Sequence, residues 1–251
     1  AAKRASAQRI NVIMPYFGYS RQDRKDEPRV PISAKVMMDI FIKAGADRVV
    51  TMDLHSTQIQ GFSSKPVDNI YGSLVLMPEL EKHFNDLSSD DNLTVLIPDM
   101  GSSKLGQSYA KRLGMSFALV DKRRDAHNQS EVVSVVGDLK NKHVLIIDDM
   151  IDTAGTACAA ISLLKEQGAR EIYFFACHGL LSKNALERIN NSKLTKLIVT
   201  NTIPHKKEVL ENEKIDIIDV SWLCAQSIYR HLNGISISEL YNEKIFNEKI
   251  R

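Results

Sequence analysis

The stretch Val144-Leu-Ile-Ile-Asp-Asp-Met-Ile-Asp-Thr-Ala-Gly-Thr156 decides the fold of this 251-residue chain. It opens with an apolar run that is typical of a buried strand, continues with two adjacent carboxylates, and ends in a short turn before a helix. Four residues of that helix recur with the spacing of a buried stripe, namely Ala157, Ala160, Ile161 and Leu164. A strand that leads into a helix through a short turn is the building unit of parallel α/β sheets.

The rest of the chain repeats this alternation of short β-branched runs and helical patterns. We expect strands at residues 10–14, 48–52, 93–97, 117–120, 143–147, 171–176, 196–200 and 215–220. A looser apolar stripe, formed by Val36, Ile40, Phe41 and Ala44, predicts the buried face of another helix. The sequence therefore predicts α/β domains with mostly parallel sheets and helices on their faces.

An internal repeat suggests that the chain contains two related halves. Gly45 follows one helix and precedes a strand and His55, and Gly168 and His178 stand in the same order with the same spacing. Glycine is common where a helix ends, but a matching strand also precedes each helix. We place the seam within residues 73–81. The expected domains are residues 1–75 with about 232–251, and residues 76–231.

Bulk composition excludes several classes of protein. Thirty-three basic and 31 acidic residues give a net charge of +2, too small for a broad nucleic-acid-binding field. The three cysteines form no CxxC pair, so neither a disulfide framework nor a zinc site is expected. No apolar run reaches the roughly 20 residues of a membrane span, and no secretory signal is evident. We expect a cytoplasmic protein. The chain does not begin with Met, and residues 2–9 resemble the end of a helix. We therefore expect that the given sequence starts in the middle of a domain.

Acidic residues follow three of the expected strands, and ligands of α/β sheets bind at the carboxyl ends of strands. These acids are Asp53, Asp99 and the pair Asp148 and Asp149. The turn after the pair, with Thr153, Gly155 and Thr156, has the residue types that wrap a phosphate at a helix start. The two carboxylates would accept sugar hydroxyls or hold magnesium through water. The alternative is a helix capped by Asp or Thr, with solvated acids.

Residues 148–156 resemble the phosphoribosyl pyrophosphate loop shared by type I phosphoribosyltransferases and phosphoribosyl pyrophosphate synthetases. Three further segments are similar to the synthetases alone: Tyr16-Phe-Gly-Tyr-Ser-Arg-Gln-Asp-Arg-Lys25, Asp53-Leu-His55 through Phe62 with Pro66-Val-Asp68-Asn69, and Lys122-Arg123-Arg124. The resemblance runs from about Lys3 to Tyr241. The sequence departs from the family pattern at Ser63 and at Gly101-Ser-Ser-Lys104. The family also has an earlier segment that binds adenine, and nothing in this sequence corresponds to it.

This resemblance implies an enzyme of nucleotide biosynthesis with two phosphoribosyltransferase-type domains. It would transfer pyrophosphate from Mg-ATP to ribose 5-phosphate, with Mg²⁺ as its cofactor. ATP would contact Arg21, Gln22, Asp26 and His55. Metal would be held by Asp53, His55, Asp68 and Asp99. Ribose 5-phosphate would bind Asp148, Asp149, Asp152, Thr153, Ala154, Gly155 and Thr156. Catalysis would fall to Lys122 and Arg124, at the start of a mobile loop.

The resemblance also implies a homo-oligomer, a hexamer built from dimers, with an allosteric site at Ser236 and Ser238. Nucleic acid is not expected as a partner, because acids interrupt the basic cluster around Arg24 and no stacking aromatic follows it. A membrane is not expected either, because no apolar run is long enough to span one. Two alternatives remain open: a type I phosphoribosyltransferase, and a non-catalytic regulatory subunit associated with a synthetase.

Overall fold

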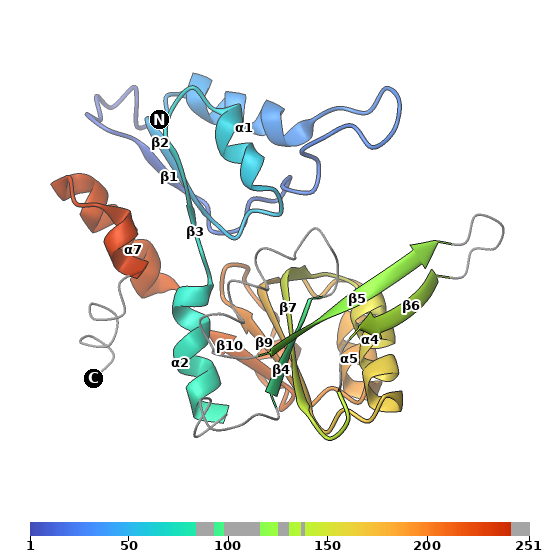
Figure 1. Cartoon of the computed structure of the whole chain (residues 1–251). Coiled ribbons are helices and arrows are strands. Elements are labelled where there is room, and N and C mark those ends of the chain that lie inside the picture. Colours follow the sequence, from blue (N-terminus) through green and yellow to red (C-terminus); the bar gives the residue numbers. More distant parts are fainter. Residues whose placement is uncertain (84–92, 98–115, 125–130, 137–138, 242–251) are drawn as a thin grey trace. The chain divides into compact units, whose positions relative to one another are not determined.

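The computed structural model describes residues 1–83, 93–97, 116–124, 131–136 and 139–241, and the chain divides into two compact units (Figure 1). The first unit consists of Ala1–Leu74 together with Val220–Arg251, and the second consists of Val75–Asp219. Each unit alternates strands and helices. None of the helices in these described ranges is long and apolar enough to cross a membrane.

The first unit contains a parallel sheet in the order β1-β2-β3. Its elements are β1 (Asn11–Ile13), α1 (Ser33–Ala44), β2 (Arg48–Met52), the 3-10 helix η1 (Thr57–Phe62), β3 (Val67–Ile70), α7 (Ser221–Asn233) and the 3-10 helix η2 (Ile237–Tyr241). Residues 2–6 form turns, so the expectation of a helix end there is wrong. Helix α7 belongs to this unit, and the return of the chain therefore begins at Val220, before the expected position near residue 232.

Helix α1 covers the core of the first unit with a face that differs from the expected one. Ala34 and Met38 are fully buried, and Phe41 packs against the same cluster. Val36 and Ile40, which the sequence assigned to the buried stripe, are 52% and 50% exposed. The helical period was correct, but the phase was wrong because apolar residues surround most of this helix.

The second unit contains, within the described residues, a seven-stranded sheet in the order β10-β9-β8-β7-β4-β5-β6. All neighbouring strands are parallel except β5 and β6. The strands are β4 (Leu93–Ile97), β5 (Ser116–Arg124), β6 (Glu131–Val136), β7 (His143–Ile151), β8 (Ile172–Gly179), β9 (Lys196–Thr200) and β10 (Ile215–Ile218). Helix α2 (Ser73–His83) lies in the expected seam, and the second unit begins within it, at Val75. The other helices of this unit are α4 (Gly155–Glu166), α5 (Ala185–Asn191) and α6 (Lys207–Leu210).

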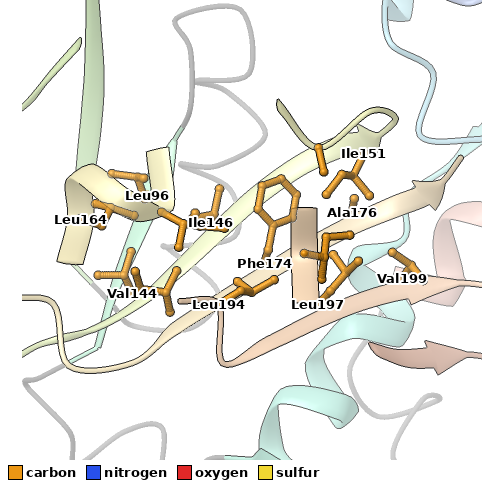
Figure 2. Close-up of a cluster of buried hydrophobic side chains, with 14 of the residues drawn as sticks. Leu96, Val144, Ile146, Ile151, Leu164, Phe174, Ala176, Leu194, Leu197 and Val199 are labelled. Carbon is orange, nitrogen blue, oxygen red and sulfur yellow. The ribbon is translucent and has the colours of Figure 1, made fainter. Parts of the chain in front are cut away.

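The core of the second unit joins strands β7, β8 and β9 to α4 (Figure 2). Ala185 and Ile189 of α5 belong to the same cluster. Every residue of β8 is buried, as expected for a central parallel strand that is covered on both faces. Ile161 and Leu164 of α4 are buried and Ala157 packs against the same cluster, which confirms the predicted stripe. This packed layer fixes the carboxyl end of β7, where the acid-rich loop (residues 148–156) begins.

The predicted repeat has the same backbone geometry in both units. Gly45 and Gly168 both have left-handed φ angles, of 111° and 87°. The residue after each glycine donates to a carbonyl of the preceding helix at 3.0 Å, to Phe41 in one unit and to Leu164 in the other. Because a left-handed turn of this kind satisfies the last helix carbonyls, each helix ends cleanly before its strand.

Candidate functional site

The acid-rich loop begins inside a strand. The sequence placed Asp148 and Asp149 after the strand, but β7 continues to Ile151, and Asp148 lies opposite Ala176 of β8. Both acids are half-buried, and the Asp149 N–H donates to Asp148 Oδ1 at 2.9 Å. These carboxylates lie at the carboxyl end of β7, a central strand, and α/β folds bind ligands at the carboxyl ends of their strands.

The turn after β7 leaves the start of α4 without a side-chain cap. Ala154 is the N-cap residue, with a left-handed φ of 58°, and no side-chain cap hydrogen bond is formed there. Its carbonyl accepts the N–H of Cys158 at 2.9 Å, which closes the first turn of the helix. The alternative of a helix capped by Asp or Thr is therefore not what the structure contains. A helix start of this kind can receive an anion.

Two residues that the sequence analysis missed are bonded to this turn. Ser182 donates its N–H to the Asp152 carbonyl at 3.1 Å and its hydroxyl to Asp152 Oδ1. Arg188 Nη1 donates to the Thr153 carbonyl at 2.8 Å. Both residues lie some 30 or more positions along the chain from their partners, so no local sequence signal marks them.

A second polar group lies at the ends of β8 and β9. His178 is 1% exposed, and its Nδ1 atom lies 2.9 Å from Thr202 Oγ1. The Thr200 hydroxyl donates to the Cys177 carbonyl at 2.7 Å. The polar atoms of these side chains are therefore hydrogen-bonded to one another and to the backbone. His178 was noticed in the sequence only as the counterpart of His55, which is exposed.

The expected ATP-contacting residues lie on the surface of the first unit. Arg21, Gln22 and Asp26 are exposed, in the segment between β1 and α1. The backbone of Gln22 is held, since its carbonyl accepts the Ala34 N–H at 3.2 Å. His55 follows β2 and is exposed. These positions leave the four side chains accessible to a ligand.

Two of the expected metal-binding acids are engaged within the protein. Asp53 is 5% exposed and accepts the Gly72 N–H at 2.9 Å through Oδ2. Asp68 pairs with Arg48 and with His231 Nε2, the latter at 3.1 Å. Within the described ranges, no three His, Cys, Asp or Glu side chains are grouped as a metal site would require. Asp99, the fourth expected ligand, lies outside the described residues.

Lys122 and Arg124 lie on a strand and not in the loop that the sequence predicted. Strand β5 extends to Arg124 because β6 pairs with it in antiparallel register, with Lys122 opposite Val133 and Arg124 opposite Glu131. The loop expected to be mobile, residues 125–130, falls outside the described part of the chain.

The two serines of the expected allosteric site are exposed near η2. Arg230, which is buried, donates to the Ser236 carbonyl at 2.9 Å and to Glu239 Oε2 at 3.0 Å. The Ser238 N–H donates to Ser236 Oγ at 3.2 Å. This segment is therefore anchored to α7.

Two family models match the chain. Residues 1–45 match the N-terminal domain of ribose phosphate pyrophosphokinase, and residues 124–242 match the phosphoribosyl synthetase-associated domain.

Curated relatives and a solved structure extend these matches over nearly the whole chain. It is 46% identical to a ribose-phosphate pyrophosphokinase of Chlorobaculum tepidum and 44% identical to one of Nitrosomonas europaea, over 100% and 97% of its length and 76% of each relative. A crystal structure of phosphoribosylpyrophosphate synthetase from Mycobacterium smegmatis is 36% identical, with a TM-score of 0.84, over 92% of this chain and 74% of that one.

Proposed function

The chain belongs to the ribose-phosphate pyrophosphokinase family, a family of enzymes, and from this premise we propose that it transfers pyrophosphate from ATP to ribose 5-phosphate. The products are phosphoribosyl pyrophosphate and AMP. The observation that carries the proposal is the uncapped start of α4 directly after two carboxylates at the end of β7. That arrangement offers donors for a phosphate and acceptors for sugar hydroxyls in adjacent positions.

Ribose 5-phosphate binds the acid-rich loop in this proposal. Backbone N–H groups at the start of α4 and the hydroxyls of Thr153 and Thr156 meet the 5-phosphate, which the positive end of the helix favours. Asp148 and Asp149 accept hydrogen bonds from the ribose hydroxyls. Such a site holds the anomeric hydroxyl in one orientation, and positioning of this kind is most of what phosphoryl transfer asks of a protein.

ATP is assigned to the first unit, at the exposed residues Arg21, Gln22, Asp26 and His55. Magnesium ordinarily keeps several waters and binds substrate phosphates with one or two protein groups, so a closed cage of protein ligands is not required. His55 and Asp99 are proposed to meet Mg-ATP. Asp53 stays a proposed ligand, because a carboxylate that accepts one backbone N–H can still bind a metal. Asp68 fits this role poorly because Arg48 and His231 share its Oδ2 atom. The ion would neutralise charge on the phosphates.

Lys122 and Arg124 are proposed to act in the transfer itself. Charge builds up between the two substrates as the anomeric oxygen approaches the β-phosphorus, and a guanidinium fork with a compact ammonium stabilises it. Lys122 and Arg124 are alternate residues of β5.

The remaining properties follow from family membership. We propose a cytoplasmic homo-oligomer, a hexamer built from dimers, that is regulated through the segment of Ser236 and Ser238. Hydrogen bonds from Arg230 and within the segment give it a defined backbone, as a regulatory site needs.

The decisive experiment incubates the purified chain with Mg-ATP and ribose 5-phosphate and follows the phosphorus species by NMR. Attack at the β-phosphorus gives AMP and phosphoribosyl pyrophosphate in equal amounts. Release of ADP would indicate a different phosphoryl transfer. Consumption of added phosphoribosyl pyrophosphate with a purine base would identify a phosphoribosyltransferase. No product from this chain alone, with a changed rate of an added active synthetase, would identify a regulatory subunit.

A further inference from the structure

Arg188 of α5 lies against the turn that leads into α4. Its Nη1 atom donates to the Thr153 carbonyl at 2.8 Å. The same atom would lie only 3.4 Å from a Cβ placed on Gly155, so the guanidinium runs alongside the turn. Nothing in the proposed function uses this arginine.

The bond to Thr153 fixes the direction of one peptide group. The chain has no cis peptide in its described ranges, and a trans peptide points its carbonyl and the following N–H in opposite directions. With the Thr153 carbonyl held on Arg188, the Ala154 N–H points to the other side of the turn. Turns that bind anions work by aiming successive N–H groups toward one point.

The turn needs such a constraint because its backbone is in a disfavoured conformation. Ala154 has a left-handed φ of 58°, which a residue with a Cβ adopts only when its surroundings hold it there. The bond from the Cys158 N–H to the Ala154 carbonyl holds the helix side of the turn. Arg188 holds the peptide on the strand side.

The segment that carries Arg188 is anchored to the same loop at a second point. Ser182 bonds both the carbonyl and the carboxylate of Asp152. Its neighbours Leu181 and Lys183 have left-handed φ values of 48° and 53°, so the connection from β8 to α5 is bent where Ser182 meets the loop. Two consecutive residues of the loop are therefore tied to one neighbouring segment.

We propose that Arg188 is a positioning residue for ribose 5-phosphate, which acts by holding the Thr153–Ala154 peptide in the orientation that turns its N–H toward the 5-phosphate. This inference rests on the proposed function of the acid-rich loop. Arg188 does not touch the reacting atoms, so its loss weakens capture of the sugar phosphate and leaves the transfer step largely intact.

The test compares Arg188→Ala, Arg188→Lys and the charge-matched control Arg170→Ala in steady-state kinetics. Arg170 is an exposed arginine just before the amino end of β8, whereas the acid-rich loop lies at the carboxyl ends of the strands. We expect Arg188→Ala to raise the KM for ribose 5-phosphate about tenfold, in line with loss of one charge-assisted hydrogen bond. The kcat and the KM for ATP should change less than about threefold. Lysine should restore part of the loss, because an ammonium can still donate to a carbonyl.

Three outcomes would overturn the inference. One is an unchanged KM for ribose 5-phosphate in Arg188→Ala. Another is an equal rise in Arg170→Ala, which would show a general effect of charge. The third is a fall in kcat by as large a factor as the rise in KM. Thermal melting of each variant excludes unfolding, and Ser182→Ala repeats the test from the second anchor if Arg188→Ala fails to fold.

Direct binding of ribose 5-phosphate, measured by calorimetry without ATP, separates this inference from the proposed function. Binding by the unmodified chain without turnover would contradict the proposed function, yet the weaker binding expected of Arg188→Ala would still be measurable. No binding by the unmodified chain would overturn both.

Discussion

His231 Nε2 lies 3.1 Å from Asp68 Oδ2, and this contact ties helix α7 to strand β3 within the first unit. Arg48 Nη1 bonds the same carboxylate and lies 3.1 Å from His231 Nε2. The His231 side chain is only 8% exposed, and its Nδ1 atom is buried without a partner. A buried imidazole beside an arginine favours the neutral ring.

The pKa of His231 should be lower than its ordinary value of 6.5, mainly because of burial and also because of the Arg48 charge, which together outweigh the pull of Asp68. The unfolded chain then binds the proton first as pH falls. Stability should therefore be full above pH 6.5 and decline as pH drops from 6.5 toward the lowered pKa. An NMR titration of the His231 ring protons measures the pKa, and the signal is assigned by its absence in His231→Gln. A midpoint at or above 6.5 would contradict the burial argument.

Asp68→Asn should destabilise the protein without changing its need for magnesium. The substitution removes the negative charge that Arg48 and His231 share and replaces one carboxylate oxygen by an amide NH2, which should cost about 1–2 kcal/mol in the free energy of unfolding. Denaturant melts measure that loss, and activity against magnesium concentration measures the metal requirement. Asp99→Asn is the comparison. A magnesium dependence shifted more by Asp68→Asn than by Asp99→Asn would restore Asp68 as a metal ligand.

The sequence predicted the core of the fold better than the edges of its sheets. Strand β7 and the stripe of α4 were predictable because apolar residues at regular spacing are buried on a central layer. Strand β3 was missed because Val67–Ile70 contains two polar residues among four. Strand β6 was missed too, although its pairing is what extends β5 to Arg124. Such pairing is a tertiary contact that local pattern does not encode.

For the candidate site, the sequence located the acid-rich loop but not its supports. The loop was predictable because its acids, hydroxyls and glycine follow one another directly in the sequence after a strand. The bonds from Ser182 and Arg188 depend on how α5 packs beside α4. The pairing of Asp68 was not predictable for the same reason, since its partner His231 comes from a distant helix.

Gly168→Ala should destabilise the protein, whereas Gly61→Ala should not. Gly168 has a φ of 87°, which costs a residue with a Cβ roughly 1–2 kcal/mol. Gly61 is the matched control, because a Cβ there meets nothing within 4 Å and its φ is not left-handed. Thermal unfolding of the two variants measures the difference. Equal melting temperatures would mean that the turn after α4 relaxes at little cost.

Lys122→Ala and Arg124→Ala should each reduce kcat by about 100-fold or more, the size of effect seen when a transition-state charge loses one donor. The KM for ribose 5-phosphate should change by only a few fold, because these residues act on the transferring group. Arg123→Ala is the matched control, since it removes one positive charge from the residue between these two in β5. A loss in Arg123→Ala equal to the other two would indicate a general role of positive charge.

Ribose 5-phosphate should stabilise the folded chain through the carboxylates of the acid-rich loop, even though the ligand is itself an anion. A ligand at 100 times its Kd adds about 2.7 kcal/mol to the free energy of unfolding, which thermal melting detects. Asp149→Asn should lose most of this gain, because a carboxylate accepts sugar hydroxyls more strongly than an amide. Glu166→Gln, at the far end of α4, removes the same charge and should keep it. If simple repulsion governed binding, Asp149→Asn would bind the phosphate more tightly, and a larger stabilisation in that variant would exclude the proposed contact.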